Sequence, residues 1–333
     1  MSSTHPSVDE STDNHMTAGP DRGRSEAEKP TVRVAVCTFN RNGPLERLLR
    51  ALLANAERLG ERTRIGVVVV DDSSAGGARN VVERFEGEFE LGVTYLHSDR
   101  QNISIARNLA VNAASRIADW VAMTDDDCEP VDCWIEALLE MQQRTDADAV
   151  CGLYRRRTPE AASKWLTDEP FLEIGLGDHE NGTALSMAGT NNSMISSRWW
   201  AAHPDIRFKP ELGITGGEDM VFYRTAHAAG LRIVFARRAA VFKNEPASRT
   251  TLSYQLRLFF WVGNSSYVTR REMASDEPHR IILQAGNHLR MALFRPIGRM
   301  WHRETPQLRY SLALTLYAFG LMTGLLGIRV SHR

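Results

Sequence analysis

The sequence has little net charge and few cysteines. Its 333 residues carry 40 Lys and Arg against 41 Asp and Glu, which leaves a formal net charge of −1. This balance excludes the uniformly basic surface of many nucleic-acid binders, so we expect no nucleic-acid partner. The four cysteines are too few for a disulfide scaffold, and Cys128 and Cys133 have no second pair of metal ligands nearby to complete a zinc site. We expect buried, reduced thiols.

The first segment lacks large apolar side chains. Residues 1–30 are rich in Ser, Thr, Asp, Glu, Gly and Pro. Such a segment cannot bury enough surface to offset the entropy of ordering, so it is predicted to be a disordered leader. It also lacks the apolar core of a secretory signal peptide, which favours an N-terminus that stays in the cytoplasm.

Residues 31–270 alternate between short strands and helices. Apolar, β-rich runs separated by helix-compatible segments lie at residues 32–37, 65–70, 93–96 and 120–124. This alternation predicts an α/β domain with a mostly parallel central sheet flanked by helices. Ligands of such sheets bind at the carboxyl ends of the strands, and polar residues stand at those ends here.

Three adjacent aspartates, Asp125, Asp126 and Asp127, follow the fourth of these runs. Their mutual repulsion requires a cation, strong hydrogen bonds or full solvation. Carboxylates at a strand end can hold Mg²⁺ or Mn²⁺ against a substrate's phosphates, whereas the alternative is a solvated loop before a helix. Asp71-Asp72 at another strand end favours the metal interpretation.

Two further polar motifs occur in the second half. Gly216-Gly217-Glu218-Asp219 opens a predicted helix, where its carboxylates could cap the helix or supply a general base that faces a cleft. Gly189-Thr190-Asn191-Asn192 offers hydroxyl and amide groups to sugar hydroxyls, although Asn pairs are also common in plain turns. Local sequence leaves both alternatives open.

Taken in order, the motifs resemble family 2 inverting glycosyltransferases of the GT-A fold. Within that family the chain is most similar to bacterial exopolysaccharide enzymes of the succinoglycan glucosyltransferase type. The resemblance covers residues 31–270. The segments that carry it are residues 34–41, 68–74, Asn102 with 106–108, 125–130, 189–192 and 216–219.

This resemblance implies an inverting transfer from a nucleotide-sugar donor, usually UDP-linked, with Mg²⁺ or Mn²⁺. The implied acceptor is a saccharide or a polyprenyl-linked saccharide, in cell-surface polysaccharide or glycolipid synthesis. A dehydrogenase is excluded because no Gly-x-Gly-x-x-Gly follows the first strand. The remaining alternative is a catalytically inactive, membrane-attached scaffold or binding subunit, which would need neither the aspartate cluster nor Asp219.

The resemblance also implies roles for individual residues. Asp219 matches the catalytic base, with Glu218 beside it toward the acceptor, and Asp127 or Asp126 matches the metal ligand. The residues expected to contact the nucleotide are Cys37, Thr38, Phe39, Asn40, Asp72, Asn102 and Asp125.

The chemistry of the reaction suggests further residues. Thr190, Asn191 and Asn192 are candidates for binding the acceptor's hydroxyl groups. Arg249 and Arg257 could help to neutralise the departing diphosphate. The order Gln255-Leu256-Arg257 departs from the Gln-x-x-Arg-Trp motif of processive members, which favours the addition of a single sugar.

Residues 271–333 are predicted to form a helical region that associates with a membrane. Residues 270–333 contain ten Arg and only four acidic residues. Residues 310–328 carry no charge over 19 residues, close to the ~20 that span a bilayer. Residues 281–303 mix apolar residues with Arg, as an interfacial helix does, and a buried helix pair that covers the sheet is the alternative. We expect a catalytic domain on the cytoplasmic face of the membrane, held peripherally or by one C-terminal span.

Overall fold

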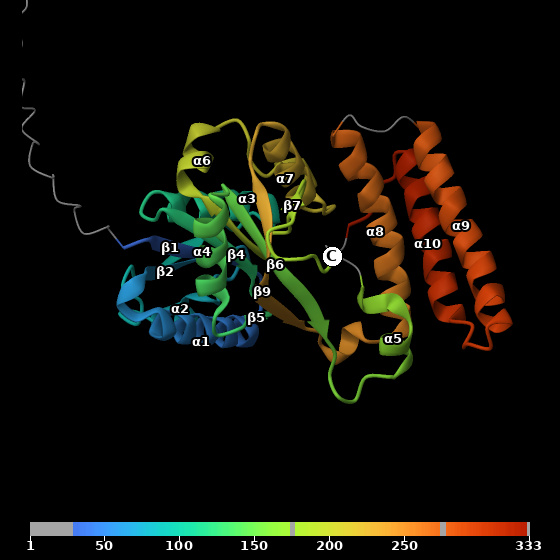
Figure 1. Ribbon diagram of the computed structural model, residues 1–333, viewed down its shortest axis with the longest axis horizontal. Coiled ribbons are helices and arrows are strands. Elements are labelled where there is room, and N and C mark those ends of the chain that lie inside the picture. Colours follow the sequence, from blue (N-terminus) through green and yellow to red (C-terminus); the bar gives the residue numbers. More distant parts are fainter. Residues whose placement is uncertain (1–28, 174–176, 274–277, 332–333) are drawn as a thin grey trace, which may run out of the picture.

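A computed structural model describes residues 29–173, 177–273 and 278–331, and Figure 1 shows its arrangement. A nine-stranded mixed sheet is flanked by helices on both faces, and three long helices stand beside it. The predicted α/β class is confirmed. The predicted leader, residues 1–30, lies outside the described residues except for its last two.

The first half of the sheet has the predicted parallel strands. In the order β3-β2-β1-β4, these are β3 (Val93–His97), β2 (Arg64–Asp71), β1 (Thr31–Thr38) and β4 (Trp120–Asp125). The apolar runs of β1, β2 and β4 are buried from both sides, as expected for a parallel sheet that helices cover on both faces, whereas β3 at the edge is only partly buried. One face is covered by α1 (Asn42–Leu59), α2 (Arg79–Glu83) and α4 (Trp134–Thr145). The other is covered by α3 (Ile103–Ser115), α6 (Ser197–Ala202) and α7 (Glu218–Ala228).

The second half makes the sheet mixed instead of mostly parallel. β8 (Asn192–Ser196) lies antiparallel between β4 and β6 (Ala149–Arg157), and β6 pairs in parallel with β9 (Ile233–Asn244). The short strands β5 (Cys128–Pro130) and β7 (Ala184–Leu185) run antiparallel to β9. Short 3₁₀ helices occur at Gly60–Arg62, Pro170–Leu172, Pro210–Leu212 and Ala247–Arg249.

The strand order creates a crevice between β1 and β4. The chain leaves β1 through α1 toward β2 on one side, whereas β4 lies on the other side of β1. Ligands of α/β sheets bind at such a point, outside the carboxyl ends of the strands. Here the Thr38 hydroxyl, at the end of β1, donates to the Asp126 carboxylate 2.8 Å away, just after β4. The two strand ends therefore meet as the sequence predicts.

The C-terminal helices form a bundle beside the sheet. α8 (Leu252–Glu272) stands nearest the sheet, and α10 (Leu308–Leu325) packs between α8 and α9 (Pro278–Trp301), with the short α5 (Trp165–Asp168) at one end (Figure 1). Gly263 and Gly320 let the backbones of α8 and α10 come close, because a Cβ on either would collide with a carbonyl oxygen of the other helix. These two glycines therefore allow close packing of α8 against α10 within the chain.

The structure does not support a C-terminal membrane span. Among the described residues, no helix combines the length and the apolar character needed to cross a bilayer. α10, which holds most of the uncharged run, buries Ala313, Leu314, Ala318 and Leu321 against its neighbours. α10 fits the alternative of a buried C-terminal helix, except that this helix packs against α8 and not against the sheet.

Candidate active site

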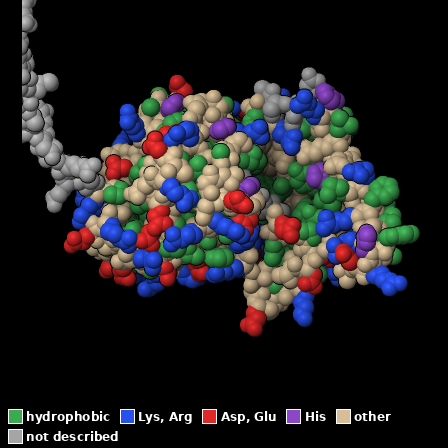
Figure 2. Space-filling model, in the orientation of Figure 1, with side chains coloured by type: hydrophobic (Ala, Val, Ile, Leu, Met, Phe, Trp, Pro, Cys, Tyr) green, Lys and Arg blue, Asp and Glu red, His purple; other side chains and the backbone are tan. Residues whose placement is uncertain are grey.

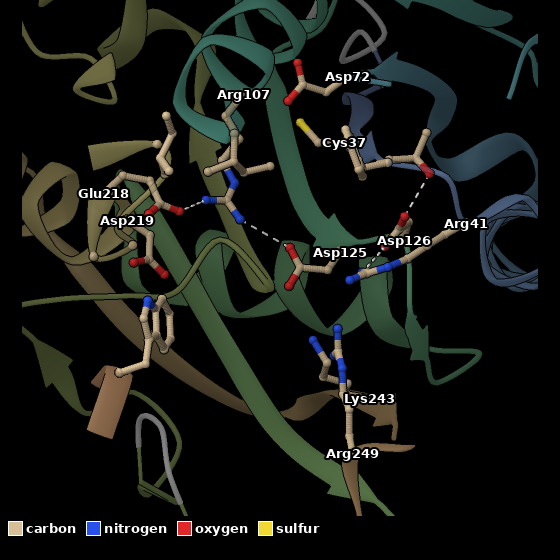
Figure 3. Close-up of a pocket in the computed structure, with 18 of the residues that line it drawn as sticks. Cys37, Arg41, Asp72, Arg107, Asp125, Asp126, Glu218, Asp219, Lys243 and Arg249 are labelled. Carbon is tan, nitrogen blue, oxygen red and sulfur yellow. Dashed lines mark hydrogen bonds and ion pairs between the residues drawn. The ribbon is translucent and has the colours of Figure 1, made fainter. Parts of the chain in front are cut away.

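A cavity of about 590 Å³ opens at the carboxyl ends of β1 and β4. Its lining comes from the ends of these strands, the start of α7, the end of β9 and one face of α8 (Figure 3). Side chains from most of the sequence motifs meet here. Of the residues expected at the site, the lining includes Cys37, Thr38, Phe39, Asp72, Asp125, Asp126, Glu218, Asp219 and Arg249.

The three aspartates have different surroundings. Asp125 is partly exposed and lies 3.3 Å from Arg107. Asp126 is buried, and its two oxygens accept from Thr38 at 2.8 Å and Arg41 at 2.9 Å. Burial raises the pKa of Asp126 to about 6, although Arg41 acts in the opposite direction. Both Asp126 oxygens thus already have protein partners.

Three basic side chains surround the Asp127 carboxylate. It forms ion pairs with Arg41 at 3.0 Å, Lys243 at 3.2 Å and Arg249 at 3.6 Å. Asp127 does not itself line the cavity, but these three basic side chains do. The cavity therefore has a cationic wall next to its carboxylates.

Two of the aspartates fit a divalent cation. Among the described residues, ligand atoms of Asp125, Asp127 and Cys128 lie within 4.8 Å of one another. Burial raises the pKa of the Cys128 thiol well above its usual range, so this thiol stays protonated and is a poor ligand for Mg²⁺ or Mn²⁺. Carboxylate oxygens suit both ions. Of the two expected metal ligands, the donor set favours Asp127, together with Asp125, over Asp126.

Arg107 joins the aspartate cluster to the acidic pair at the start of α7. Located on α3, it forms an ion pair with Glu218 as well as with Asp125 (Figure 3). Burial opposes the charge on Arg107, but Glu218 and Asp125 raise its pKa, so the guanidinium stays protonated. Burial raises the pKa values of Glu218 and Asp219, and the charge of Arg107 lowers both. Arg107 therefore favours the ionised form of each carboxylate.

Asp219 lies where two cavities meet. Its Oδ1 accepts the Met220 N–H at 2.8 Å, and its side chain lines both the first cavity and a second one of about 390 Å³. Lys243, Arg249, Tyr254 and Trp261 also line both. Glu218 is buried and pairs with Arg107; it lines the first cavity but not the second.

Several expected nucleotide and phosphate ligands lie elsewhere. Asn102 begins α3: its Oδ1 accepts the N–H groups of Ser104 and Ile105, and its Nδ2 donates to the Pro210 carbonyl at 2.8 Å. The Asn102 amide thus has a structural role, since an N-cap side chain satisfies free N–H groups of the helix. Asn40 and Arg257 are not among the residues that line either cavity.

The Gly-Thr-Asn-Asn motif divides between site and core. Asn191 lines the second cavity, whereas Thr190 is buried beside a small internal cavity near Arg107. Asn192 is fully buried: it accepts from the Trp134 indole at 2.8 Å and donates to the carbonyls of Leu153 and Ala239, each at 2.8 Å. Asn192 has no free polar group for an acceptor, and it fastens β8 to α4, β6 and β9.

Replacing Asn192 by Ala should lower the free energy of unfolding by about 3 kcal/mol, because three buried groups lose their partner. The matched variant is Asn191→Ala, which should change stability by less than about 0.5 kcal/mol and raise the KM for the acceptor. Urea unfolding of both variants measures the difference. Equal stabilities would contradict the structural role of Asn192.

Residues at the site that the sequence did not identify include Arg41, Arg107, Lys243 and Trp261. Arg41 and Arg107 stand inside segments that carry the family resemblance, so their place in those segments is a usable signal. Lys243 and Trp261 reach the cavity only through the packing of β9 and α8, which no local pattern indicates.

Comparisons with known proteins find similar glycosyltransferases. The family model described as glycosyl transferase family 2 matches residues 33–201. The succinoglycan biosynthesis protein ExoM of Rhizobium meliloti is 28% identical over 90% of this chain and 94% of its own length. The glycosyltransferase AglE of Haloferax volcanii is 22% identical over 62% of this chain and 64% of its own length.

Solved structures share the fold at low sequence identity. TarS from S. aureus in complex with UDP is 13% identical and aligns with a TM-score of 0.51 over 90% of this chain and 92% of its own. The mannosyltransferase PcManGT from Pyrobaculum calidifontis, in complex with GDP-Man and Mn²⁺, is 14% identical and has a TM-score of 0.55 over 90% of this chain and 74% of its own. The family model and these folds show that the chain is a glycosyltransferase that belongs to glycosyl transferase family 2, with a GT-A-like fold.

Proposed function

We propose that the chain transfers one sugar, with inversion, from a UDP-linked donor to a hydroxyl group of a saccharide or lipid-linked saccharide. We place the reaction in the synthesis of a cell-surface polysaccharide or glycolipid and assign it a requirement for Mg²⁺ or Mn²⁺. The observation that carries the proposal is a single cavity that combines carboxylates, a cationic wall and Asp219. The relation to ExoM and the ligands of TarS and PcManGT support this choice of substrate and ion.

The donor's nucleotide would occupy the part of the cavity nearest β1. Cys37, Thr38 and Phe39 line this part together with Asp72, which suits hydrogen bonding to the base. Burial raises the pKa of the Cys37 thiol to about 12, so the thiol adds no negative charge next to the phosphates. A neutral thiol at this position is compatible with an anionic ligand.

The donor's diphosphate would lie against Arg41, Lys243 and Arg249. All three side chains now pair with Asp127, and phosphate oxygens could replace this carboxylate as their partner. Asp127 and Asp125 would then be available to hold the divalent cation, which as a Lewis acid would supply positive charge against the departing diphosphate. Arg249 would thus help to neutralise the diphosphate, as the sequence suggests, together with Lys243 and Arg41.

Asp219 would act as the general base. An acceptor in the second cavity, near Asn191 and Trp261, would direct a hydroxyl oxygen at the anomeric carbon. The new oxygen–carbon bond forms as the bond to the nucleoside diphosphate breaks on the opposite face, which inverts the configuration, and the hydroxyl proton passes to Asp219. Arg107 would support this step because its charge lowers the pKa of Asp219, against the effect of burial, and so favours the ionised carboxylate.

A thermal-shift experiment tests the donor site. A UDP-sugar with Mn²⁺ should raise the melting temperature, because a ligand at one hundred times its Kd stabilises the folded state by about 2.7 kcal/mol. EDTA should remove most of the shift, and GDP- and dTDP-sugars should produce smaller ones. If no nucleotide sugar shifts the melting temperature in the presence of Mn²⁺ or Mg²⁺, the proposed donor site is wrong.

A further inference from the structure

Helix α9 exposes an apolar face to solvent. On its inner side, Ile281 and Ala285 are buried against α10. On its outer side, large hydrophobic side chains are between 43% and 85% exposed, and Trp301 is the most exposed of them. These are Ile282, Leu283, Leu289, Leu293, Phe294, Ile297, Met300 and Trp301. We call this set the α9 outer face.

The α9 outer face is continuous along the helix. Ile282, Leu289, Leu293, Ile297 and Met300 recur at spacings of seven, four, four and three residues, which places them on one side of an α-helix. The face extends over most of a 24-residue helix, roughly 36 Å long. Figure 2 shows hydrophobic side chains at the edge of the molecule that α9 forms. Few other large hydrophobic side chains are exposed outside the two C-terminal helices.

Positive charge accompanies this apolar face. α9 contains four arginines, Arg280, Arg290, Arg295 and Arg299, and no acidic residue. Arg280 and Arg290 are exposed, whereas Arg295 donates to Gln307 at 3.0 Å and Arg299 forms an ion pair with Glu304 at 3.0 Å. Because the whole chain has a net charge of −1, the rest of the protein is acidic. A partner that accepts apolar side chains and carries negative charge near Arg280 and Arg290 would therefore fit this face.

We propose that α9 lies flat on an anionic lipid surface. The α9 outer face would enter the boundary between headgroups and acyl chains, while arginines bind lipid phosphates. Trp301 and Phe294 suit that boundary because aromatic side chains favour it. A folded protein partner would need an acidic groove matched to the whole helix, whereas an anionic bilayer supplies both properties. This assignment moves the membrane contact from the uncharged run at residues 310–328 to α9, and it does not depend on the proposed reaction.

Vesicle flotation tests this proposal on the full chain. The protein should float with vesicles of phosphatidylcholine and phosphatidylglycerol, and less with phosphatidylcholine alone or at high salt. Ile297→Glu should lower the partition coefficient about tenfold or more, because it places a charge among the inserted side chains. The matched control is Ile117→Glu: Ile117 is 58% exposed and Ile297 is 57% exposed, but Ile117 lies between α3 and β4. The control should bind as the wild type does.

Each alternative outcome overturns the proposal. Wild-type protein that stays unbound with anionic vesicles excludes a lipid partner. Equal binding by wild type and Ile297→Glu, at unchanged melting temperatures, excludes the α9 outer face as the contact. A wild-type dimer in lipid-free sedimentation that Ile297→Glu converts to a monomer would instead make this face a contact between two copies. Thermal shifts with nucleotide sugars, measured on the same proteins, report whether the donor site binds its ligand. A failure of lipid binding can therefore be distinguished from a failure of the proposed function.

Discussion

Asp219→Asn should reduce kcat by about a thousandfold, because the amide cannot accept the proton of the attacking hydroxyl. Binding of the UDP-sugar should change by less than about twofold, since Asp219 lies at the junction of the two cavities and away from the β1 residues assigned to the nucleotide. Single-turnover rates and donor titrations of the same preparation measure both quantities.

Asp205→Asn is the matched control for this substitution. Asp205 is an exposed aspartate in the loop after α6, so the same chemical change there should leave kcat and donor binding unaffected. Full turnover by Asp219→Asn would assign the base to another residue. Loss of donor binding together with kcat would mean that Asp219 contacts the donor and is not solely a base.

Arg107→Met should lower the free energy of unfolding by about 3–5 kcal/mol, because it leaves buried carboxylates without their counter-charge. Arg107 is 13% exposed at its side chain and pairs with both Glu218 and Asp125. Urea unfolding measures this loss. Arg116→Met is the control, since Arg116 is exposed at the end of the same helix and should contribute less than about 0.5 kcal/mol.

The same variant should shift the pH profile. A general base must be ionised, so the rate rises with pH through the pKa of Asp219, which burial already places above the usual aspartate range. Arg107 lowers that pKa, so Arg107→Met should move the acid limb of kcat/KM to higher pH, and Arg107→Lys should restore much of the original profile. An unchanged acid limb in Arg107→Met would mean that Arg107 stabilises the fold through its ion pairs and does not set the pKa of Asp219.

The first half of the fold could be predicted because its signals are local. Continuous apolar runs identify strands that helices cover on both faces, and Asp71, Asp125 and the residues around Thr38 mark their carboxyl ends. Parallel strands place those ends at one edge of the sheet, so motifs far apart in sequence were expected to meet. The direction of β8 was not predictable, because an apolar run does not reveal whether its neighbour is parallel.

Composition was a poor guide to the two C-terminal helices. α10 holds most of the uncharged run at residues 310–328, which is the expected membrane span, yet this helix is largely enclosed by α8 and α9. α9 carries four arginines, yet its outer face remains exposed and apolar. A helix is buried when other helices pack against it on two sides. α10 is buried in this way because glycines let α8 and α10 approach each other closely.

The amino-acid sequence was sufficient to establish the family, the α/β class and the segments that build the site, because these depend on residue order and local pattern. The individual roles depended on contacts across the fold. Asn102 and Asn192 have amides suited to a ligand, but one caps α3 and the other links three strands and a helix. Arg107 became part of the site because α3 carries it between Asp125 and Glu218. The physical reason is that side-chain direction, burial and charge pairing are set by neighbours distant in sequence, which no local pattern encodes.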